Sequence, residues 1–327
     1  MLGIETSCDE TAVAVLKRGR VTAETIVAQN DLHADFGGVV PELASRQHAR
    51  AITRSISDVL RQSQLSSPAK DLDGVAVTYG PGLAGSLMVG VSAAKALSLA
   101  WDVPLVAVDH MEGHLFAGTL MSPVDLPSLT LLVSGGHSQL IEITEPGRYV
   151  ELGGTLDDAA GEAFDKVARL LGLSFPGGPE IERVALLGDG SYIRFPRALS
   201  GDTLDFSFSG LKTAVLRYLE IHGPVNVNDV AAAFQEAVVD ALAHKVGMAL
   251  RKREYRSVVI GGGVAANTLL RSRIEELCAA AGVKAVIPPK RLCTDNGAMI
   301  AAAGAFRLGL GQVAALDIGI DTSLSLA

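Results

Sequence analysis

The sequence has few cysteines, few aromatic residues and no excess of positive charge. Its three cysteines form no C-x-x-C pair, which excludes a disulfide framework and a thiolate zinc site and favours a reducing compartment. A net charge of −8 argues against a protein whose whole surface binds nucleic acid, although it is compatible with a local basic patch. The amino terminus lacks a basic segment followed by an apolar one, and no apolar run approaches about 18 residues. We therefore expect a cytoplasmic protein that does not span a membrane.

The chain is rich in glycine and aliphatic residues, and short apolar runs alternate with helical periods. Hydrophobic residues make up 48% of the 327 residues and glycines number 35, a composition typical of folded domains with many close turns. The length suggests roughly two domains. Two apolar hairpins, at residues 2–16 and 129–143, each open a series of helices and strands. This weak internal duplication predicts an α/β fold of two duplicated domains of the actin-like ATPase and sugar-kinase (ASKHA) architecture around a nucleotide cleft.

The predicted boundaries follow this duplication. Residues 1–115 are expected to form the first actin-like domain and residues 116–309 the second, with inserted helices, while the segment at about 310–327 packs back on the first. Periodicity predicts the remaining elements. The predicted helices cover residues 41–62, 86–100, 162–171, 180–187, 230–252, 264–281 and 296–308. The predicted strands outside the hairpins cover residues 74–79, 105–108, 258–260 and 283–287.

The sharpest candidate site is the sequence HMEGH at residues 110–114. His110 and His114 lie at i and i+4, on one face of a helix, directly after a predicted strand. A zinc peptidase needs its glutamate beside the first histidine, whereas Glu112 lies about 200° around the helix from it, which argues against a peptidase. Asp295, at a predicted helix start, is the best candidate for a third ligand. The alternatives are a surface pair of histidines and a helix-capping role for Asp295.

Three glycine-rich turns could approach a phosphate or a nucleotide. Residues 80–85 match G-x-G-x-x-G, and Asp109 follows the next strand, but close helix–strand packing explains these glycines better than dinucleotide binding. Residues 134–137 (SGGH) and 261–267 (GGGVAAN) are more informative together. They offer free backbone amides and a close approach to a flat ring, which favours an adenylate site. Tight turns without a ligand remain the alternative for each.

Seven short motifs occur in order along nearly the whole chain. They are GIETSCDET at 3–11, GGVVPE at 37–42, HMEGH at 110–114, LVSGGH at 132–137, AGEAFDK at 160–166, FSFSGLKT at 206–213 and CTDN at 293–296. Together they resemble the tRNA N6-adenosine threonylcarbamoyltransferase (TsaD) family, formerly described as sialoglycoprotein endopeptidases. The resemblance implies transfer of the threonylcarbamoyl group from threonylcarbamoyl-AMP to N6 of the adenosine 3′ of the anticodon. The tRNAs concerned read codons beginning with A, and AMP is released.

The resemblance also implies the site residues. His110, His114 and Asp295 would hold one divalent metal ion per subunit, iron in the first place and zinc as the alternative. The residues that would bind the adenylate are Leu132, Val133, Ser134, Gly135, Gly136, Asp165, Gly178, Glu182 and Asn267. The family usually has aspartate where this sequence has Glu182. No general base for N6 is implied.

The implied partners are tRNA, the paralogous subunit TsaB and the ATPase TsaE. The helix at 86–100 carries small residues that suit an interface, or simply pack on the sheet. The one dense basic run, residues 251–256, is explained better by an exposed helix end than by an RNA contact. The alternative functions are a small-molecule kinase of the same fold and a noncatalytic scaffold paralogue. The kinase would usually place an aspartate near the second hairpin, where residues 131–139 contain none, and the scaffold should lack the metal ligands.

Overall fold

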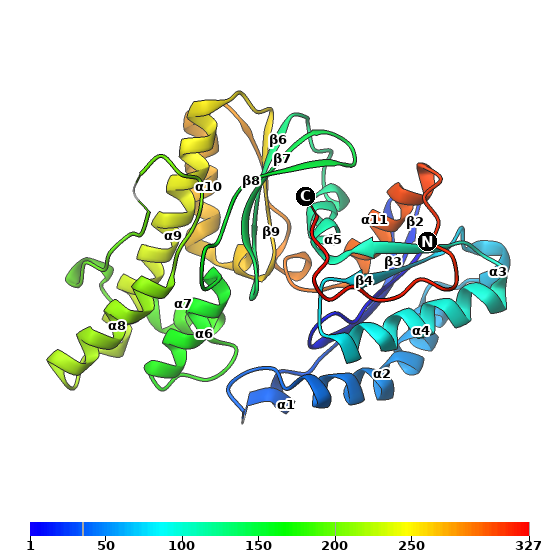
Figure 1. Ribbon diagram of the computed structural model, residues 1–327, viewed down its shortest axis with the longest axis horizontal. Coiled ribbons are helices and arrows are strands. Elements are labelled where there is room, and N and C mark those ends of the chain that lie inside the picture. The colour runs from blue at the N-terminus through cyan, green and yellow to red at the C-terminus, as the bar shows by residue number, and fades with distance from the viewer. Residues whose placement is uncertain (35, 200, 327) are drawn as a thin grey trace. The chain divides into compact units, whose positions relative to one another are not determined.

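The structure is a computed structural model that describes residues 1–34, 36–199 and 201–326. The chain forms two units, Met1–Pro123 with Thr294–Leu326, and Val124–Cys293. Each unit holds one five-stranded sheet, in the order β3-β2-β1-β4-β5 in the first and β10-β9-β6-β7-β8 in the second (Figure 1). In both, the first three strands form an antiparallel meander and the last two add in parallel beside its first strand. The duplicated α/β fold predicted from the sequence is confirmed.

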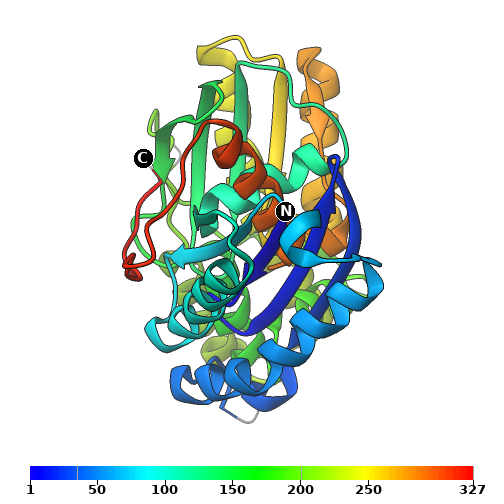
Figure 2. The ribbon, with the colours of Figure 1, turned by 90° about the vertical axis from the view of Figure 1, so that its right-hand side faces the viewer.

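The first unit places its sheet between two pairs of helices. Its strands are β1 (Leu2–Glu5), β2 (Glu10–Lys17), β3 (Arg20–Ala28), β4 (Val75–Gly80) and β5 (Leu105–Asp109). Its helices are α1 (Asn30–Ala34), α2 (Pro41–Gln62), α3 (Pro68–Asp71), α4 (Ala84–Trp101), α5 (His110–Ala117) and α11 (Gly297–Gly309), with a 3₁₀ turn at Gly118–Leu120. Helices α2 and α4 cover one face of the sheet, and α5 and α11 cover the other (Figures 1 and 2). All four residues of β1 are buried, as a central strand with helices on both faces requires.

Helix α11 lies in the first unit, whereas the sequence analysis placed residues up to 309 in the second. It packs so closely on β1 that a Cβ added to Gly3 would lie 2.3 Å from the carbonyl oxygen of Gly297. The first eight residues of the helix are all buried, and burial against this sheet explains why the chain returns to the first unit after Cys293. The following segment runs along the same sheet, where the Ala314 amide donates to Leu105 O at 2.8 Å and the Asp321 amide donates to Tyr79 O at 2.8 Å.

Helix α4 is the one helix in the described part of the chain that is long and apolar enough to cross a membrane. It packs on β4 and α2, and its buried residues recur at helical spacing along the side that faces them. The length and apolar composition of α4 are therefore explained by its packing as one of the helices that cover the sheet.

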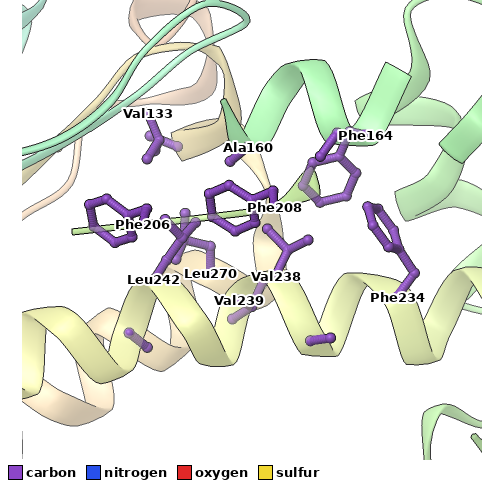
Figure 3. Packing of buried hydrophobic residues seen from close by; sticks show 14 of the residues in the cluster. Val133, Ala160, Phe164, Phe206, Phe208, Phe234, Val238, Val239, Leu242 and Leu270 are labelled. Atoms are coloured by element: carbon purple, nitrogen blue, oxygen red, sulfur yellow. The ribbon is translucent and has the colours of Figure 1, made fainter. Parts of the chain in front are cut away.

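The second unit has its core between its sheet and helix α9. Its strands are β6 (Ser128–Val133), β7 (Ser138–Glu145), β8 (Arg148–Gly154), β9 (Ser257–Gly261) and β10 (Lys284–Val286). Its helices are α6 (Ala160–Leu170), α7 (Gly177–Ala185), α8 (Ser209–His222), α9 (Val227–Lys252) and α10 (Thr268–Ala281), with 3₁₀ turns at Gly190–Tyr192, Gly263–Ala266 and Lys290–Leu292. Figure 3 shows Phe164 of α6, Phe234 and Val238 of α9, and Phe208 packed together. The rings of Phe164 and Phe234 pack edge to face, with their centroids 5.3 Å apart.

The predicted helix at 264–281 is wrong as a single element. A 3₁₀ turn ends at Ala266, Asn267 is extended, and α10 begins at Thr268. The Asn267 side chain accepts a hydrogen bond from the Leu270 amide at 3.0 Å, so it caps a new helix. Strands β3 and β8 and helices α1, α3 and α8 were not predicted from the sequence either.

Candidate functional site

Helix α5 presents two histidines at the carboxyl end of strand β5. The Asp109 carboxylate accepts hydrogen bonds from the amides of Met111 (2.7 Å) and Glu112 (3.2 Å), and this cap starts the helix at His110. His110 and His114 then lie one turn apart, with ring centroids 4.7 Å from each other. His110 is 8% exposed and His114 is fully buried, so they are not a surface pair.

Asp295 joins the two histidines from the segment before α11. Asn296 caps that helix by accepting from the Met299 amide at 2.8 Å, which leaves the neighbouring Asp295 side chain free of a capping role. Asp295 Oδ1 lies 3.2 Å from His114 Nε2 and 3.5 Å from His110 Nε2. One ligand atom from each of the three residues lies within 4.8 Å of the others. The structure thus brings together the three residues predicted as metal ligands.

The chemistry of this group fits a metal ion. Among the described residues, the buried Nδ1 of His114 has no hydrogen-bond partner, and the buried Nε2 faces only Asp295 Oδ1, at 3.2 Å. An unsatisfied buried nitrogen is costly, and a metal bond would satisfy it. Two imidazoles and one carboxylate are a donor set that suits iron or zinc and leaves coordination positions open.

Glu5, at the end of strand β1, orients His110 from behind. Its Oε2 lies 3.0 Å from His110 Nδ1, and Ser7 Oγ lies 3.1 Å from the same nitrogen. Thr78 Oγ1 and the Ser7 amide each donate to the fully buried Glu5 carboxylate at 2.5 Å. A carboxylate at Nδ1 directs Nε2 of the same ring toward the metal position, a common arrangement behind ligating histidines. The sequence analysis did not single out Glu5, although it stands in the first motif.

The electrostatics of the group follow from burial and mutual contact. Burial opposes a charge on His110, but Asp295 and Glu5 outweigh it and raise the pKa of His110 to about 9. Burial likewise opposes a charge on Asp295, but His110 and the contact with His114 lower the pKa of Asp295 to about 2. Burial, followed by the charges of Asp295 and Asp9, raises the pKa of Glu10 to about 10. A metal ion that binds here displaces the proton of His110.

Glu112 takes no part in this group. It is buried and forms an ion pair with Arg307 of α11, whose Nη1 also donates to Ala107 O at 3.2 Å. The pair fastens α5 to α11. A carboxylate held in this way is not available as the base of a zinc peptidase, in agreement with the sequence argument.

The glycines of residues 80–85 pack against protein. An added Cβ would lie 2.0 Å from Asp321 O at Gly80, 2.7 Å from Ser7 O at Gly82 and 2.9 Å from Ser45 Cβ at Gly85. These glycines therefore serve close packing. Asp109 caps α5, so neither part of the G-x-G-x-x-G pattern acts as a dinucleotide site.

The first part of the predicted adenylate set lies at the end of β6. Leu132 and Val133 are its last two residues, and Ser134, Gly135 and Gly136 form the turn to β7. The turn contacts the start of α6, where the amides of Gly161 and Glu162 donate to Ser134 O and Gly135 O at 3.2 and 3.1 Å. A Cβ added to Gly135 or Gly136 would meet nothing within 4 Å. Packing therefore does not require glycine at either position.

Asp165, Gly178 and Glu182 lie on α6 and α7. Asp165 Oδ1 accepts from the Gly177 amide at 2.7 Å, which holds the start of α7 against α6. Gly178, one residue further, faces open space. Glu182 Oε1 accepts from the Thr268 amide at 2.9 Å and lies 3.6 Å from Lys290 Nζ. Glu182 therefore reaches the start of α10.

Asn267 completes a ring of contacts among these elements. Its side chain donates to Gln235 Oε1 at 2.7 Å and accepts from the Leu270 amide, so one amide hydrogen and one oxygen lone pair remain. The preceding turn holds Gly262 at φ +86°, and a Cβ there would lie 2.3 Å from Val133 O. The nine predicted residues thus lie on four parts of the second unit: the end of β6 with its turn, α6, α7 and the start of α10. The β6 turn contacts α6, α6 contacts α7, and α7 contacts the start of α10.

Comparisons with known proteins point to one family. The sequence profile described as "TsaD: tRNA N6-adenosine threonylcarbamoyltransferase" matches residues 20–302. A protein of that name from Geobacter sp. strain M21 is 49% identical over 97% of this chain and 94% of its own length. One from Desulfitobacterium hafniense is 51% identical over 94% and 92%. One from Bacillus cereus is 47% identical over 100% and 96%.

Solved structures resemble the chain in fold alone. Component A of (R)-2-hydroxyglutaryl-CoA dehydratase from Acidaminococcus fermentans aligns with a TM-score of 0.55 at 20% identity, over 95% of this chain and 98% of that one. HypF from T. kodakarensis aligns with a TM-score of 0.64 at 14% identity, over 95% of this chain and 48% of that one. These neighbours support the actin-like fold class.

Proposed function

The chain belongs to the tRNA N6-adenosine threonylcarbamoyltransferase family, and from that premise we propose that it moves the threonylcarbamoyl group of threonylcarbamoyl-AMP to N6 of the adenosine 3′ of the anticodon. The substrate tRNAs read codons beginning with A, and AMP leaves. The observation that carries the proposal is the convergence of His110, His114 and Asp295, whose ligand atoms lie within 4.8 Å. A noncatalytic paralogue would have no reason to keep this group.

His110, His114 and Asp295 would hold the metal ion, iron or zinc. When bound, the ion supplies a Lewis acid that polarises an oxygen of the threonylcarbamoyl group. Glu5 fixes the ring of His110 in the orientation that binding requires, through the 3.0 Å contact at Nδ1. Asp109 fixes both histidines by setting where α5 begins.

The adenylate would lie against the turn after β6 and the starts of α6, α7 and α10. The amides of Gly135 and Gly136 suit a phosphate, and the open position at Gly178 lets the nucleotide approach the backbone of α7. The carboxylates of Asp165 and Glu182 suit ribose hydroxyls. Transfer from a mixed anhydride already has a good leaving group, so positioning and charge stabilisation account for most of what the residues must supply.

The adenylate site is tested by replacing Glu182 with alanine. A hydrogen bond to a charged group contributes roughly 1.5–3 kcal/mol, so Glu182→Ala is expected to weaken adenylate binding about ten- to hundredfold. Isothermal titration calorimetry with a non-hydrolysable threonylcarbamoyl-AMP analogue measures the affinity. The matched control is Glu180→Ala, on the same helix, whose carboxylate pairs with Arg183 at 2.8 Å and should leave binding unchanged. Equal affinity in both variants would contradict the assignment of Glu182.

The proposed partners are the paralogue TsaB, through helix α4, and the ATPase TsaE. Met88 and Leu99 of α4 are 58% and 71% exposed, and they lie 11 residues apart, which is about three turns along one face. Exposed apolar side chains of this size on one face favour a protein interface. We propose that the complex acts in the cytoplasm, where its tRNA substrate is used.

Charging this face is expected to separate the subunits. A Met88→Glu/Leu99→Glu double variant should bind TsaB at least a hundredfold more weakly, because two carboxylates would be buried without partners. Analytical ultracentrifugation of the mixed subunits measures the loss. Leu187→Glu, at another exposed leucine (73% exposed), is the control and should leave the heterodimer intact. A double variant that still forms the heterodimer would place the interface elsewhere.

A further inference from the structure

A pocket of about 430 Å³ in the second unit belongs to neither set of site residues. It lies between α9, α10 and the segment around residue 197, and its charged and titratable lining consists of Arg197, Asp240, His244, Lys245, Arg251 and Arg273. Its volume is within the usual range for small-ligand sites. The remaining lining comes largely from alanines and a leucine.

The charges around this pocket do not balance. Arg197 and Asp240 neutralise each other, because Nη2 and Nε of Arg197 donate to Asp240 Oδ2 at 2.7 and 3.2 Å. Arg273 is 3.9 Å from the other oxygen of Asp240, at the limit of an ion pair. Lys245 and Arg251 add two further positive charges. Four cations thus face one carboxylate in a chain whose net charge is −8.

Lys245 is the buried member of this group. It is 2% exposed, and its ammonium donates to Leu199 O at 2.5 Å and to Thr203 O at 2.6 Å. An ammonium has three hydrogens, so one remains for another acceptor. Both acceptors are carbonyl oxygens, which orient the ammonium, and the nearby carboxylate of Asp205 also acts on its charge.

Arg251 is the cation of the pocket whose charge is not paired within the described residues. Within the described residues its side chain forms no ion pair or hydrogen bond, unlike its neighbours in the basic run. Lys252 donates to Asp202 O at 2.8 Å, and Arg253 pairs with Glu142. Gly247 lies one turn before Arg251 and next to its guanidinium: a Cβ on Gly247 would be in van der Waals contact with Arg251 Nη1, at 3.4 Å. The basic run therefore gives Arg251 to the pocket, whereas Lys252 and Arg253 contact the segment at Asp202 and strand β7.

We propose that this pocket binds a backbone phosphate of the tRNA substrate, an inference that rests on the proposed function. Guanidinium groups donate paired hydrogen bonds to phosphate oxygens, and Arg251 and Arg273 offer two of them beside the remaining donor of Lys245. An acidic enzyme that binds a polyanion needs such a local concentration of cations. The alanine and leucine side chains give the adjoining sugar an apolar surface. A free phosphorylated metabolite would use the same contacts, and the experiment separates the two sources.

The test compares two double variants in the complex with its partners. Arg251→Ala/Arg273→Ala removes two charges from the pocket, and Arg148→Ala/Arg217→Ala removes two from elsewhere in the second unit. At about 100 mM salt the pocket variant is expected to bind tRNA at least tenfold more weakly. The slope of log Kd against log salt should fall by about 0.7–0.9, the contribution of the one phosphate contact that the variant loses. KM for tRNA should rise, and affinity for the adenylate analogue should stay as in the wild type.

The outcomes distinguish this inference from the proposed function. Equal tRNA affinity and salt slope in both variants, with a wild type that modifies tRNA, would overturn the pocket assignment alone. Titration with inorganic pyrophosphate is the second arm. Pyrophosphate binding that the pocket variant loses, with tRNA affinity unchanged, would overturn tRNA as the source in favour of a metabolite. A wild-type complex that neither binds nor modifies tRNA would overturn both the function and this inference.

Discussion

A His110→Ala/His114→Ala double variant is expected to hold no metal and to transfer the threonylcarbamoyl group at least about a hundredfold more slowly. The two rings provide two of the three ligand atoms that lie within 4.8 Å, and Asp295 alone does not make a site. A bound metal contributes several kcal/mol of charge stabilisation, and each 1.4 kcal/mol is a factor of ten in rate. Metal per chain is measured by inductively coupled plasma mass spectrometry on protein purified under both iron and zinc supply.

Burial of both rings means that the double variant also loses packing, so a second variant is needed. Asp295→Asn keeps the shape of the side chain and removes only its charge. It should melt close to the wild type and still lose most of its metal. His222→Ala, at an exposed histidine of α8 in the second unit, controls for loss of a histidine. One metal ion per chain in folded Asp295→Asn or in the double variant would contradict the assignment.

Gly297→Ala is expected to destabilise the first unit by about 3 kcal/mol and to empty the metal site. An added Cβ would lie 2.5 Å from the amide nitrogen of Ala14 and 2.6 Å from the carbonyl carbon of Val13. Both atoms belong to the backbone of β2, so no side chain can move aside and α11 must shift. Asp295 lies two residues before this contact, and the shift moves it away from His110 and His114. Thermal unfolding should show a decrease of roughly 6–12 °C in Tm.

Gly309→Ala provides the matched control at the other end of the same helix. A Cβ there would meet nothing within 4 Å, and alanine favours a helix over glycine. This variant should melt at or slightly above the wild-type temperature and keep its metal. A Gly297→Ala protein with normal Tm and full metal occupancy would show that α11 does not set the position of Asp295.

Periodicity predicted the elements whose buried faces are long and regular. Helix α2 was predicted at its observed bounds, and both hairpins at 2–16 and 129–143 are present. Strands β3 and β8 were not predicted because each buries a single residue, Ala23 in β3 and Gly153 in β8. Neither strand therefore shows an alternation of apolar and polar side chains. The break at Asn267 depends on a side-chain cap that competes with helix continuation, which hydrophobic periodicity does not record.

The candidate ligands were predictable because their types and spacing carry the chemistry. Two histidines at i and i+4 after a predicted strand can be found from local spacing alone. Asp295, 181 residues from His114, became the third candidate through its place at a predicted helix start, and the resemblance to the family implied the same residue. Glu5 could not be found in that way. Its role depends on β1 lying beside β4 in the sheet, where Thr78 donates to it, and on the approach of α5, which no local pattern encodes. The pocket of Lys245 likewise forms only when α9 and α10 pack.

The central claim is tested most directly by following both products of one reaction. The purified chain with TsaB and TsaE is given threonylcarbamoyl-AMP and unmodified tRNA that reads a codon beginning with A. Mass spectrometry of the digested nucleosides and chromatography of the nucleotides measure modified adenosine and AMP. The account predicts that N6-threonylcarbamoyladenosine and AMP rise one to one, and that both stop rising when the chain is replaced by Asp295→Asn. Release of AMP without modified tRNA, or full modification by Asp295→Asn that contains no metal, would contradict it.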